Sequence, residues 1–390
     1  MIGWYVHHHG HGHLRRMTAV LPHLDDDVVV FSSLPRPPAL PAPRTGTVTW
    51  VQLAQDTAAA VDPVDPTAGG SLHWAPTNIT GHAQRLATIA GWAPELTAMV
   101  VDVSCEVAML SRLLGLRVVV VAQAGERTDA AHRRCFELAE AIIVPLPAPT
   151  MRTGQAYAAA VPHAFRFSAK TSFTGGISVT QSVPRGNAGG ATAGTATVGS
   201  GVDATARAGC LLLGSRGGST LDGDTFAALR AGSRHSWSAV GLDDATWTAD
   251  ILPRLRAARV VLSSAGLGAI ADVMSARTPA VFVPQTRPFG EQDANGVLLR
   301  TLGFPVLAGG DIGPDLDDGL AEAAGREFPW EAWGLGGAAE RAAEVIDRVS
   351  RDLPKIAGGT GRAVVPPAAS PTAPSSTPTP TSTAASVPGA

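Results

Sequence analysis

The sequence predicts an α/β protein with two doubly wound parallel-sheet domains, and three observations carry this prediction. Short runs rich in valine and isoleucine alternate with helical patterns over residues 1–165. Two glycine-containing turns in the region 210–355 each follow an apolar run and precede a helical pattern. A glycine-, alanine- and threonine-rich stretch without core residues, 184–209, separates the two parts. Buried strands that alternate with helices are typical of a parallel sheet with both faces covered.

In the first domain, the predicted strands are short apolar runs and the predicted helices fill the stretches between them. The strands are expected at 2–6, 28–32, 99–103, 118–122 and 141–144. The helices are expected at 13–21, 83–93, 105–114 and 129–138. Open α/β sheets bind ligands at the carboxyl ends of their strands, so polar residues that follow these strands are the candidate site residues.

A run of histidines, HHHGHGH at 7–13, follows the first predicted strand and opens a helix. Imidazoles are good zinc ligands, but no HExxH or carboxylate pattern accompanies the run, so we expect no metal site. Loop histidines that satisfy local hydrogen bonds are an alternative interpretation. Asp102, at the end of another strand, can orient a histidine, or it can stabilise the start of the helix that follows it.

The first glycine turn of the second domain, GSRGGST at 214–220, lies between an apolar run at 210–213 and a helical pattern that includes 226–229. Backbone amides freed by Gly217 and Gly218 can point at a diphosphate, with the charge of Arg216 nearby. The turn lacks the Gly-Lys-Ser/Thr of a Walker loop and the GxGxxG spacing of dinucleotide sites. Hydrolysis of nucleoside triphosphates and binding of NAD are therefore disfavoured.

The second glycine turn follows an apolar run at 259–264 and opens a helix that carries Asp272. Gly266 and Gly268 let a ligand approach the backbone, and the amides of the helix start favour an anion. A further strand is expected at 280–283. The loop 285–292 that follows it is rich in amide and carboxylate side chains, which suit sugar hydroxyls, although a solvated loop is the alternative.

In this order, the motifs resemble the donor-binding domain of GT-B glycosyltransferases of family 28, the group that contains MurG, over roughly 210–349. The resemblance implies a GT-B fold, in which two Rossmann-like domains face a cleft. It predicts an acceptor domain at 1–165, an interdomain segment at 166–209 and a donor-binding domain at 210–355. A helix at 337–353 would cross back onto the first domain, and the Pro/Ser/Thr-rich tail, 356–390, should be disordered.

The resemblance also implies site residues. Gly10-His11-Gly12-His13 matches the acceptor-side GxGH loop, which makes His13 the expected base, His11 the second choice, and Asp102 a third catalytic candidate. Asp272 stands where the family usually has a ribose-binding glutamate, and is shorter by one methylene. The expected donor-binding residues are Gly214, Ser215, Arg216, Gly217, Gly218, Ser219, Ser264, Ala265, Gly266, Asp272, Gln285, Glu291, Gln292 and Asn295.

The implied activity is that of an inverting hexosyltransferase, which uses a UDP-sugar as co-substrate and no metal or other cofactor. The acceptor stays open among small molecules, lipids and glycans. A non-hydrolysing UDP-sugar 2-epimerase is the nearest alternative, although the clustered carboxylates typical of it are not found. A catalytically silent nucleotide-sugar binding protein is the third alternative, with the histidines serving structure.

Composition limits the partners and the compartment. The formal net charge of −3 gives no reason to expect nucleic acid as a partner. Three cysteines without metal spacing indicate reduced core residues. No signal peptide is expected, and no run reaches the roughly 18 apolar residues of a membrane span. We therefore expect a cytoplasmic protein, with peripheral contact to the inner face of the membrane left open.

Overall fold

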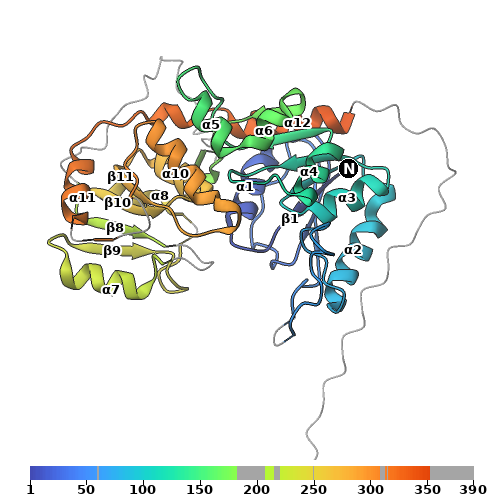
Figure 1. Cartoon of the computed structure of the whole chain (residues 1–390), viewed down its shortest axis with the longest axis horizontal. Helices are drawn as coiled ribbons and strands as arrows, with labels where there is room; N and C mark the ends of the chain where they lie inside the picture. Colours follow the sequence, from blue (N-terminus) through green and yellow to red (C-terminus); the bar gives the residue numbers. More distant parts are fainter. Residues whose placement is uncertain are drawn as a thin grey trace, which may run out of the picture. The chain divides into compact units, whose positions relative to one another are not determined.

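The computed structural model describes residues 1–58, 61–181, 207–214, 220–248, 250–307, 312–313 and 315–351. Within them, the strands form two parallel sheets, one of seven strands in the order β3-β2-β1-β4-β5-β6-β7 and one of four in the order β11-β10-β8-β9 (Figure 1). The predicted α/β class with two doubly wound sheets is confirmed. The tail predicted to be disordered, 356–390, lies outside the described residues.

The seven-strand sheet brings the carboxyl ends of its strands to one edge. Its strands are β1 (Ile2–Val6), β2 (Val28–Ser32), β3 (Val48–Gln52), β4 (Ala98–Asp102), β5 (Arg117–Val121), β6 (Ala141–Val144) and β7 (Thr171–Phe173). β1 lies between β2 and β4, and its last residue, Val6, is in register with Asp102. Asp102 is in turn in register with Val121 of β5. The histidine run after β1 therefore starts beside Asp102 and the segment after β5.

Helices cover both faces of this sheet. They are α1 (Gly12–Val20), α2 (Thr80–Trp92), α3 (Cys105–Leu113), α4 (Ala130–Leu138), α5 (Gly154–Ala160) and α6 (Pro162–Arg166). Successive residues of a strand point to opposite faces, so β1 sends Tyr5 into one apolar cluster and Trp4 into another. The cluster of Trp4 also holds Met17 of α1.

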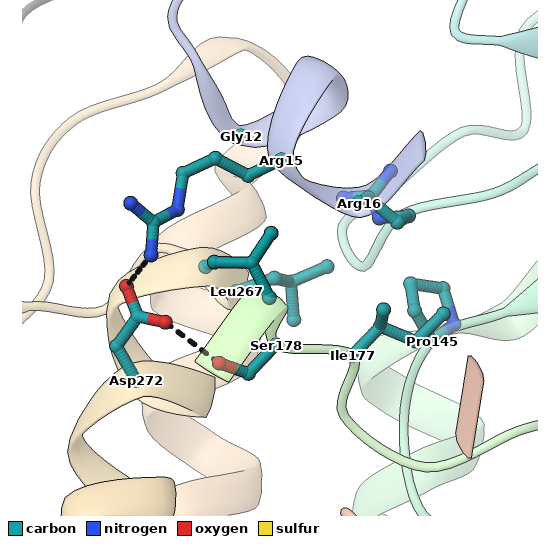
Figure 2. A pocket seen from close by; sticks show the side chains of 10 residues that line it. Gly12, Arg15, Arg16, Pro145, Ile177, Ser178, Leu267 and Asp272 are labelled. Carbon is teal, nitrogen blue, oxygen red and sulfur yellow. Dashed lines mark hydrogen bonds and ion pairs between the residues drawn. The ribbon is translucent and has the colours of Figure 1, made fainter. Parts of the chain in front are cut away.

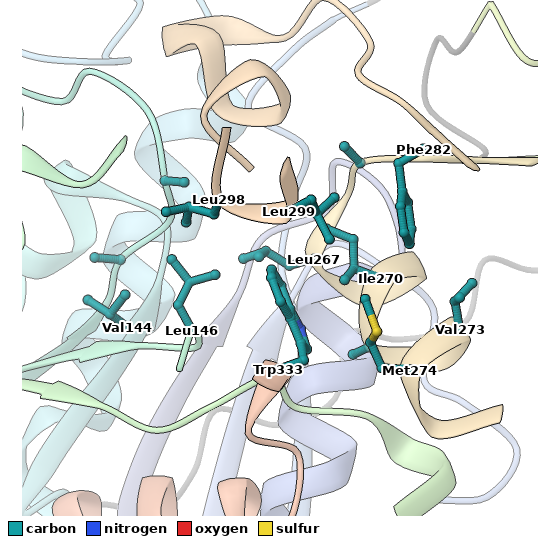
Figure 3. Packing of buried hydrophobic residues seen from close by; sticks show 14 of the residues in the cluster. Val144, Leu146, Leu267, Ile270, Val273, Met274, Phe282, Leu298, Leu299 and Trp333 are labelled. Atoms are coloured by element: carbon teal, nitrogen blue, oxygen red, sulfur yellow. The ribbon is translucent and has the colours of Figure 1, made fainter. Parts of the chain in front are cut away.

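The second sheet consists of β8 (Cys210–Leu213), β9 (Trp237–Val240), β10 (Val260–Ser264) and β11 (Ala280–Val283). Its helices are α7 (Gly223–Gly232), α8 (Leu252–Ala257), α9 (Leu267–Ala276), α10 (Glu291–Thr301) and α11 (Leu316–Ala324), with α7 beside the edge strand β9 in Figure 1. The apolar core is continuous between the halves. Figure 3 shows Leu146 of the first half in the same cluster as Leu267 and Leu298, with Trp333 among them.

The last described helix, α12 (Ala338–Arg351), packs on the first half although it follows the second. Its small and apolar side chains, such as Ala342 and Ile346, belong to the cluster that holds Trp4 and Met17. The helix expected to cross back at 337–353 is thus confirmed over 338–351. No helix in the described part of the chain is long and apolar enough to cross a membrane.

The sequence did not predict several elements. β3 and β9 are edge strands whose side chains are in part exposed, so they lack the continuous apolar run of a central strand. β7 is short and half-buried, and it pairs with β6, which carries the first sheet beyond residue 165. The helices α5, α6, α8, α10 and α11 were also not predicted.

Candidate functional site

A cavity of about 760 Å³ is lined by residues of both halves. On the first half, its lining comes from the turn after β1 and from the segments that follow β4 and β5. On the second half, it comes from the ends of β8 and β9 and from the segments after β10 and β11. Each of these segments follows the carboxyl end of a parallel strand, which is where open α/β sheets bind ligands.

His13, on the first turn of α1, is held by a buried carboxylate. Its Nδ1 lies 2.9 Å from Oδ1 of Asp102, and Nη1 of Arg16 donates to both oxygens of that carboxylate at 2.7 and 2.8 Å. Burial raises the pKa of Asp102, but the charges of Arg16 and His13 and their hydrogen bonds together hold it below its usual value. An ionised Asp102 favours a proton on Nδ1 of His13, which leaves Nε2 as the proton acceptor.

The turn after Asp102 is strained and firmly anchored. Val103 lines the cavity with φ of 67°, a left-handed conformation that a β-branched residue rarely adopts. Ser104 then caps α3 by accepting from the amide of Val107 at 3.2 Å. Glu106 in the first turn of α3 accepts from the amides of His73 and Trp74 at 2.7 and 3.0 Å, which places His73 in the cavity wall.

The rest of the histidine run packs around His13. Gly10 has φ of 76°, which lets the chain turn from β1 into α1, and Gly12 begins the helix. His11 is exposed at the N-cap of α1, whereas His13 makes the contact with Asp102. The rings of His7 and His8 stack at 4.7 Å. Burial, followed by the charges of neighbouring histidines, holds the pKa of His7 well below its usual value, so it stays neutral.

Gln123, two residues after β5, is a buried site residue that the sequence analysis missed. With its amide nitrogen towards Glu291, it donates to Oε2 and Oε1 of that carboxylate at 2.5 and 3.0 Å. Its amide oxygen then faces Nδ1 of His13 at 3.4 Å. Glu291 also lies 3.5 Å from Arg127, another residue of the first half. A polar residue directly after a buried strand was the signal that could have singled Gln123 out.

Residues 285–292 were expected to form a loop, and this prediction is wrong for its last two residues. A 3-10 turn (Pro288–Gly290) ends at Gly290 with φ of 63°, and α10 begins at Glu291. Acidic residues in a first turn stabilise a helix start, which accounts for Glu291 and Asp293 there. Glu291 is therefore held by a helix rather than by a mobile loop.

Phe289 fastens this turn to the first half. Its φ is 63°, its carbonyl oxygen accepts from the amide of Glu126 at 2.8 Å, and its ring lies 4.8 Å from the guanidinium of Arg127. The ring of His132 meets it edge-on at 4.7 Å. These contacts hold the start of α10 against the segment that follows β5.

Gln292 and Asn295 of α10 hold the turn after β10. Oε1 of Gln292 accepts from the amides of Ala265 and Gln285, both at 3.0 Å. Nδ2 of Asn295 donates to the carbonyl of Ala265 at 2.9 Å. Both side chains are buried, and in this structure their hydrogen bonds go to the main chain. Their predicted contact with sugar hydroxyls stays a prediction.

The end of β10 and the turn after it line the cavity through Ser264 and Gly266, while Ala265 between them is buried. Gly266 is the N-cap of α9 and offers no side chain to cap it. Unpaired amides of this helix start suit an anion.

Asp272, in the second turn of α9, bridges to the first half (Figure 2). Arg15 donates to its Oδ2 at 2.6 Å and Ser178 donates to its Oδ1 at 2.8 Å. Burial raises the pKa of Asp272, against the opposing effects of Arg15 and Ser178. Both carboxylate oxygens therefore have protein partners in this structure, and the predicted contact with ribose stays a prediction.

The remaining donor-site candidates surround the first glycine turn. Gly214 follows β8 and lines the cavity. Oε1 of Gln285 accepts from the amide and hydroxyl of Thr220, both at 2.7 Å, so it holds the far end of that turn. Ser215, Arg216, Gly217, Gly218 and Ser219 lie outside the described residues.

Comparisons with known proteins bear on the fold and on the second half of the chain. Residues 234–305 match the model of the glycosyltransferase family 28 C-terminal domain. No curated protein matches the chain significantly. Among solved structures, the chain is similar to the glycotransferase of kitacinnamycin, with 14% identity, a TM-score of 0.50, and coverage of 89% of this chain and 98% of that one.

Two plant proteins are similar to this chain over about the same share of its length. Arabidopsis thaliana UGT89C1 complexed with UDP shares 11% identity at a TM-score of 0.56, covering 90% of this chain and 99% of that one. A UDP-glucosyltransferase from Polygonum tinctorium shares 15% identity at a TM-score of 0.50, covering 90% and 93%. At these identities the likeness establishes the fold. The chain thus has the GT-B fold, and its residues 234–305 match the model of the glycosyltransferase family 28 C-terminal domain.

Proposed function

We propose that the protein transfers a sugar from a nucleotide-diphospho sugar, with UDP as the nucleotide, to an acceptor hydroxyl with inversion at the anomeric carbon. The family 28 match and the GT-B fold support sugar transfer. UDP is suggested by two similar structures, one described as complexed with UDP and the other as a UDP-glucosyltransferase. The acceptor stays open among small molecules, lipids and glycans.

The observation that carries the proposal is the His13–Asp102–Arg16 arrangement at the cavity. In the proposed reaction, Nε2 of His13 takes the proton of the acceptor hydroxyl while its oxygen attacks C1 of the sugar. The bond from C1 to the diphosphate oxygen breaks, and its electron pair leaves with the diphosphate. The charge that forms on His13 is balanced by Asp102, and a single displacement inverts C1.

The second half would hold the leaving group. The start of α9 at Gly266 and Leu267 lines the cavity and presents the positive end of the helix dipole. In this proposal that charge, together with the glycine turn at 214–220, stabilises the diphosphate without a metal ion. Glu291 is the candidate for sugar hydroxyls, because its partly exposed side chain lines the same cavity.

Substitution of the two histidines tests the proposal. We expect His13→Ala to lower kcat by about 100-fold or more, since a general base contributes on that order, with the Kd for UDP changed less than about twofold. His11→Ala is the matched control and should lower kcat by less than about tenfold. Radiolabelled transfer assays and titration calorimetry give the two quantities. Losses well under tenfold in both variants would overturn the assignment of the base.

Two further assays distinguish the transferase from the 2-epimerase and from the nucleotide-sugar binding protein. In the first, the protein is incubated with UDP-sugars and no acceptor. Epimer formation without an acceptor would favour the 2-epimerase. Tight UDP binding without turnover across a broad acceptor panel would favour a binding protein.

A further inference from the structure

The two walls of the cavity are joined by a polar chain that runs through Gln123. Its amide group lies between a carboxylate of the second half, Glu291, and the imidazole of the first half, His13. Gln123 is itself buried, with 6% of its surface exposed, so water competes little for these contacts. It follows β5, whose end is in register with Asp102.

The direction of the hydrogen bonds along this chain is set by the two ends. A carboxylate accepts only, so the amide nitrogen of Gln123 must face Glu291. The amide oxygen therefore faces Nδ1 of His13. It is a second acceptor for the N–H group that Nδ1 directs at Asp102. Asp102 and Gln123 thus both favour the tautomer in which Nε2 is the base.

We propose that Gln123 is a positioning residue that ties His13 to Glu291 across the cavity. Contact with Glu291 holds the amide in place, and the amide in turn limits rotation of the His13 ring. His13, whose ring is already bound by Asp102, is then held by a second contact that depends on the seating of Glu291 against the first half. The consequence for turnover rests on the proposed function, whereas the contact itself does not.

Other groups near the chain support this assignment and do not replace it. Arg127 lies 3.5 Å from Glu291, and its positive charge balances the negative charge of that carboxylate. Arg16 contacts Asp102 through both of its carboxylate oxygens. Within the described residues, Gln123 is the side chain that contacts both the candidate base and the candidate sugar-binding carboxylate.

A double-mutant cycle with reversed polarity tests the link. Gln123→Glu places two carboxylates against each other, and we expect kcat about tenfold lower with the Kd for UDP within twofold. In the Gln123→Glu/Glu291→Gln variant, an amide again meets a carboxylate. The factor by which Gln123→Glu lowers kcat should therefore be at least about fivefold smaller in the Glu291→Gln background than in the wild type. Gln123→Met, which keeps the shape, should also lower kcat without raising KM for the donor.

Melting temperatures of the four proteins of the cycle, which are the wild type, Gln123→Glu, Glu291→Gln and the double variant, provide a readout that needs no substrate. Gln123→Glu should lower the melting temperature, and the added Glu291→Gln should restore part of it. Gln52 is the matched control, since it ends the edge strand β3 and its amide contacts main-chain oxygens. Gln52→Glu should have the same effect in both backgrounds.

Four outcomes separate the possibilities. Additive effects of Gln123→Glu and Glu291→Gln on both kcat and melting would overturn the link, as would a Gln123→Met variant with unchanged kcat and KM. If the melting temperatures are coupled but the protein transfers no sugar, the contact of Gln123 with Glu291 is upheld and the proposed function is refuted. Coupling in both kcat and the melting temperature would support both the contact and the proposed function.

Discussion

At the scale of single residues, burial decides the protonation of two imidazoles in the first half of the protein, on α4 and α6. His163 on α6 stacks on Phe136 with ring centres 4.8 Å apart, and neither of its ring nitrogens has a hydrogen-bond partner within the described residues. Burial lowers its pKa to about 3. Burial also lowers the pKa of His132 to about 4, with Arg127 adding to the effect. Both residues are therefore neutral in the folded protein near neutral pH.

Because the pKa of His163 is lower in the folded protein than in the unfolded chain, acid destabilises the fold. As pH falls below about 6.5, the unfolded chain binds a proton at residue 163 while the folded protein does not, so stability is lost between about pH 6.5 and pH 3. At pH 4.5 this one residue should reduce the free energy of unfolding by about 3 kcal/mol.

We therefore expect His163→Phe, which retains the stacking, to lose less stability than the wild type between pH 7.5 and pH 4.5. Urea denaturation at the two pH values measures the difference. Equal losses in both proteins would show that His163 titrates normally in the folded state.

At the scale of elements, α10 holds the donor-side turn through side chains rather than through the backbone. Gln292 accepts two main-chain hydrogen bonds, one from the turn after β10 and one from the segment after β11. Its removal would leave two buried amides without an acceptor, and a buried unsatisfied group costs about 1–3 kcal/mol. The position of the turn at Ala265 and Gly266 therefore depends on the seating of α10.

We expect Gln292→Leu to lower the free energy of unfolding by about 2 kcal/mol or more and to weaken UDP binding several-fold. Chemical denaturation and titration calorimetry measure the two effects. Gln84→Leu on the exposed face of α2 is the matched control and should change neither quantity. Unchanged UDP affinity in Gln292→Leu would mean that the turn does not contact the donor.

The sequence predicted the central strands closely because they are buried on both faces and read as continuous apolar runs. β1, β2 and β6 begin and end where predicted, and β4 and β5 are displaced by one residue. The proximity of His13 and Asp102 could be predicted in the same way, since His13 follows β1 and Asp102 ends the adjacent parallel strand β4. The contacts of Gln123 with Glu291 and of Arg15 with Asp272 could not, because they depend on how the two sheets meet. No periodicity in the sequence encodes that arrangement.

At the scale of the whole molecule, an ion pair helps to join the two halves. Arg15 of α1 and Asp272 of α9 are 257 positions apart in the chain, and Ser178 contributes a third group from the segment between the sheets. Loss of Arg15 would leave the buried carboxylate of Asp272 without its counter-ion, and breaking a buried pair in this way costs several kcal/mol.

We expect Arg15→Ala to lower the free energy of unfolding by about 3 kcal/mol at pH 7.5, and the added Asp272→Asn to restore much of it. The pKa of Asp272 is already raised by burial. Because its protonation in the folded state relieves the unpaired charge, the loss in Arg15→Ala should shrink as pH falls. Denaturation curves of the single and double variants, with the exposed Arg36→Ala as control, measure this. A double variant no more stable than Arg15→Ala would rule out the uncompensated charge as the cause.

The return of α12 to the first half has a consequence for the order in which the chain folds during synthesis. One face of the seven-strand sheet, with Trp4 and Met17, is completed by Ala342 and Ile346 near the end of the described chain. A ribosome that has made the whole first half, and even the second, has not yet released the helix that covers this face. The apolar surface therefore stays open to water until residues 338–351 have left the ribosome. The two halves consequently reach their final state together, although each has its own sheet.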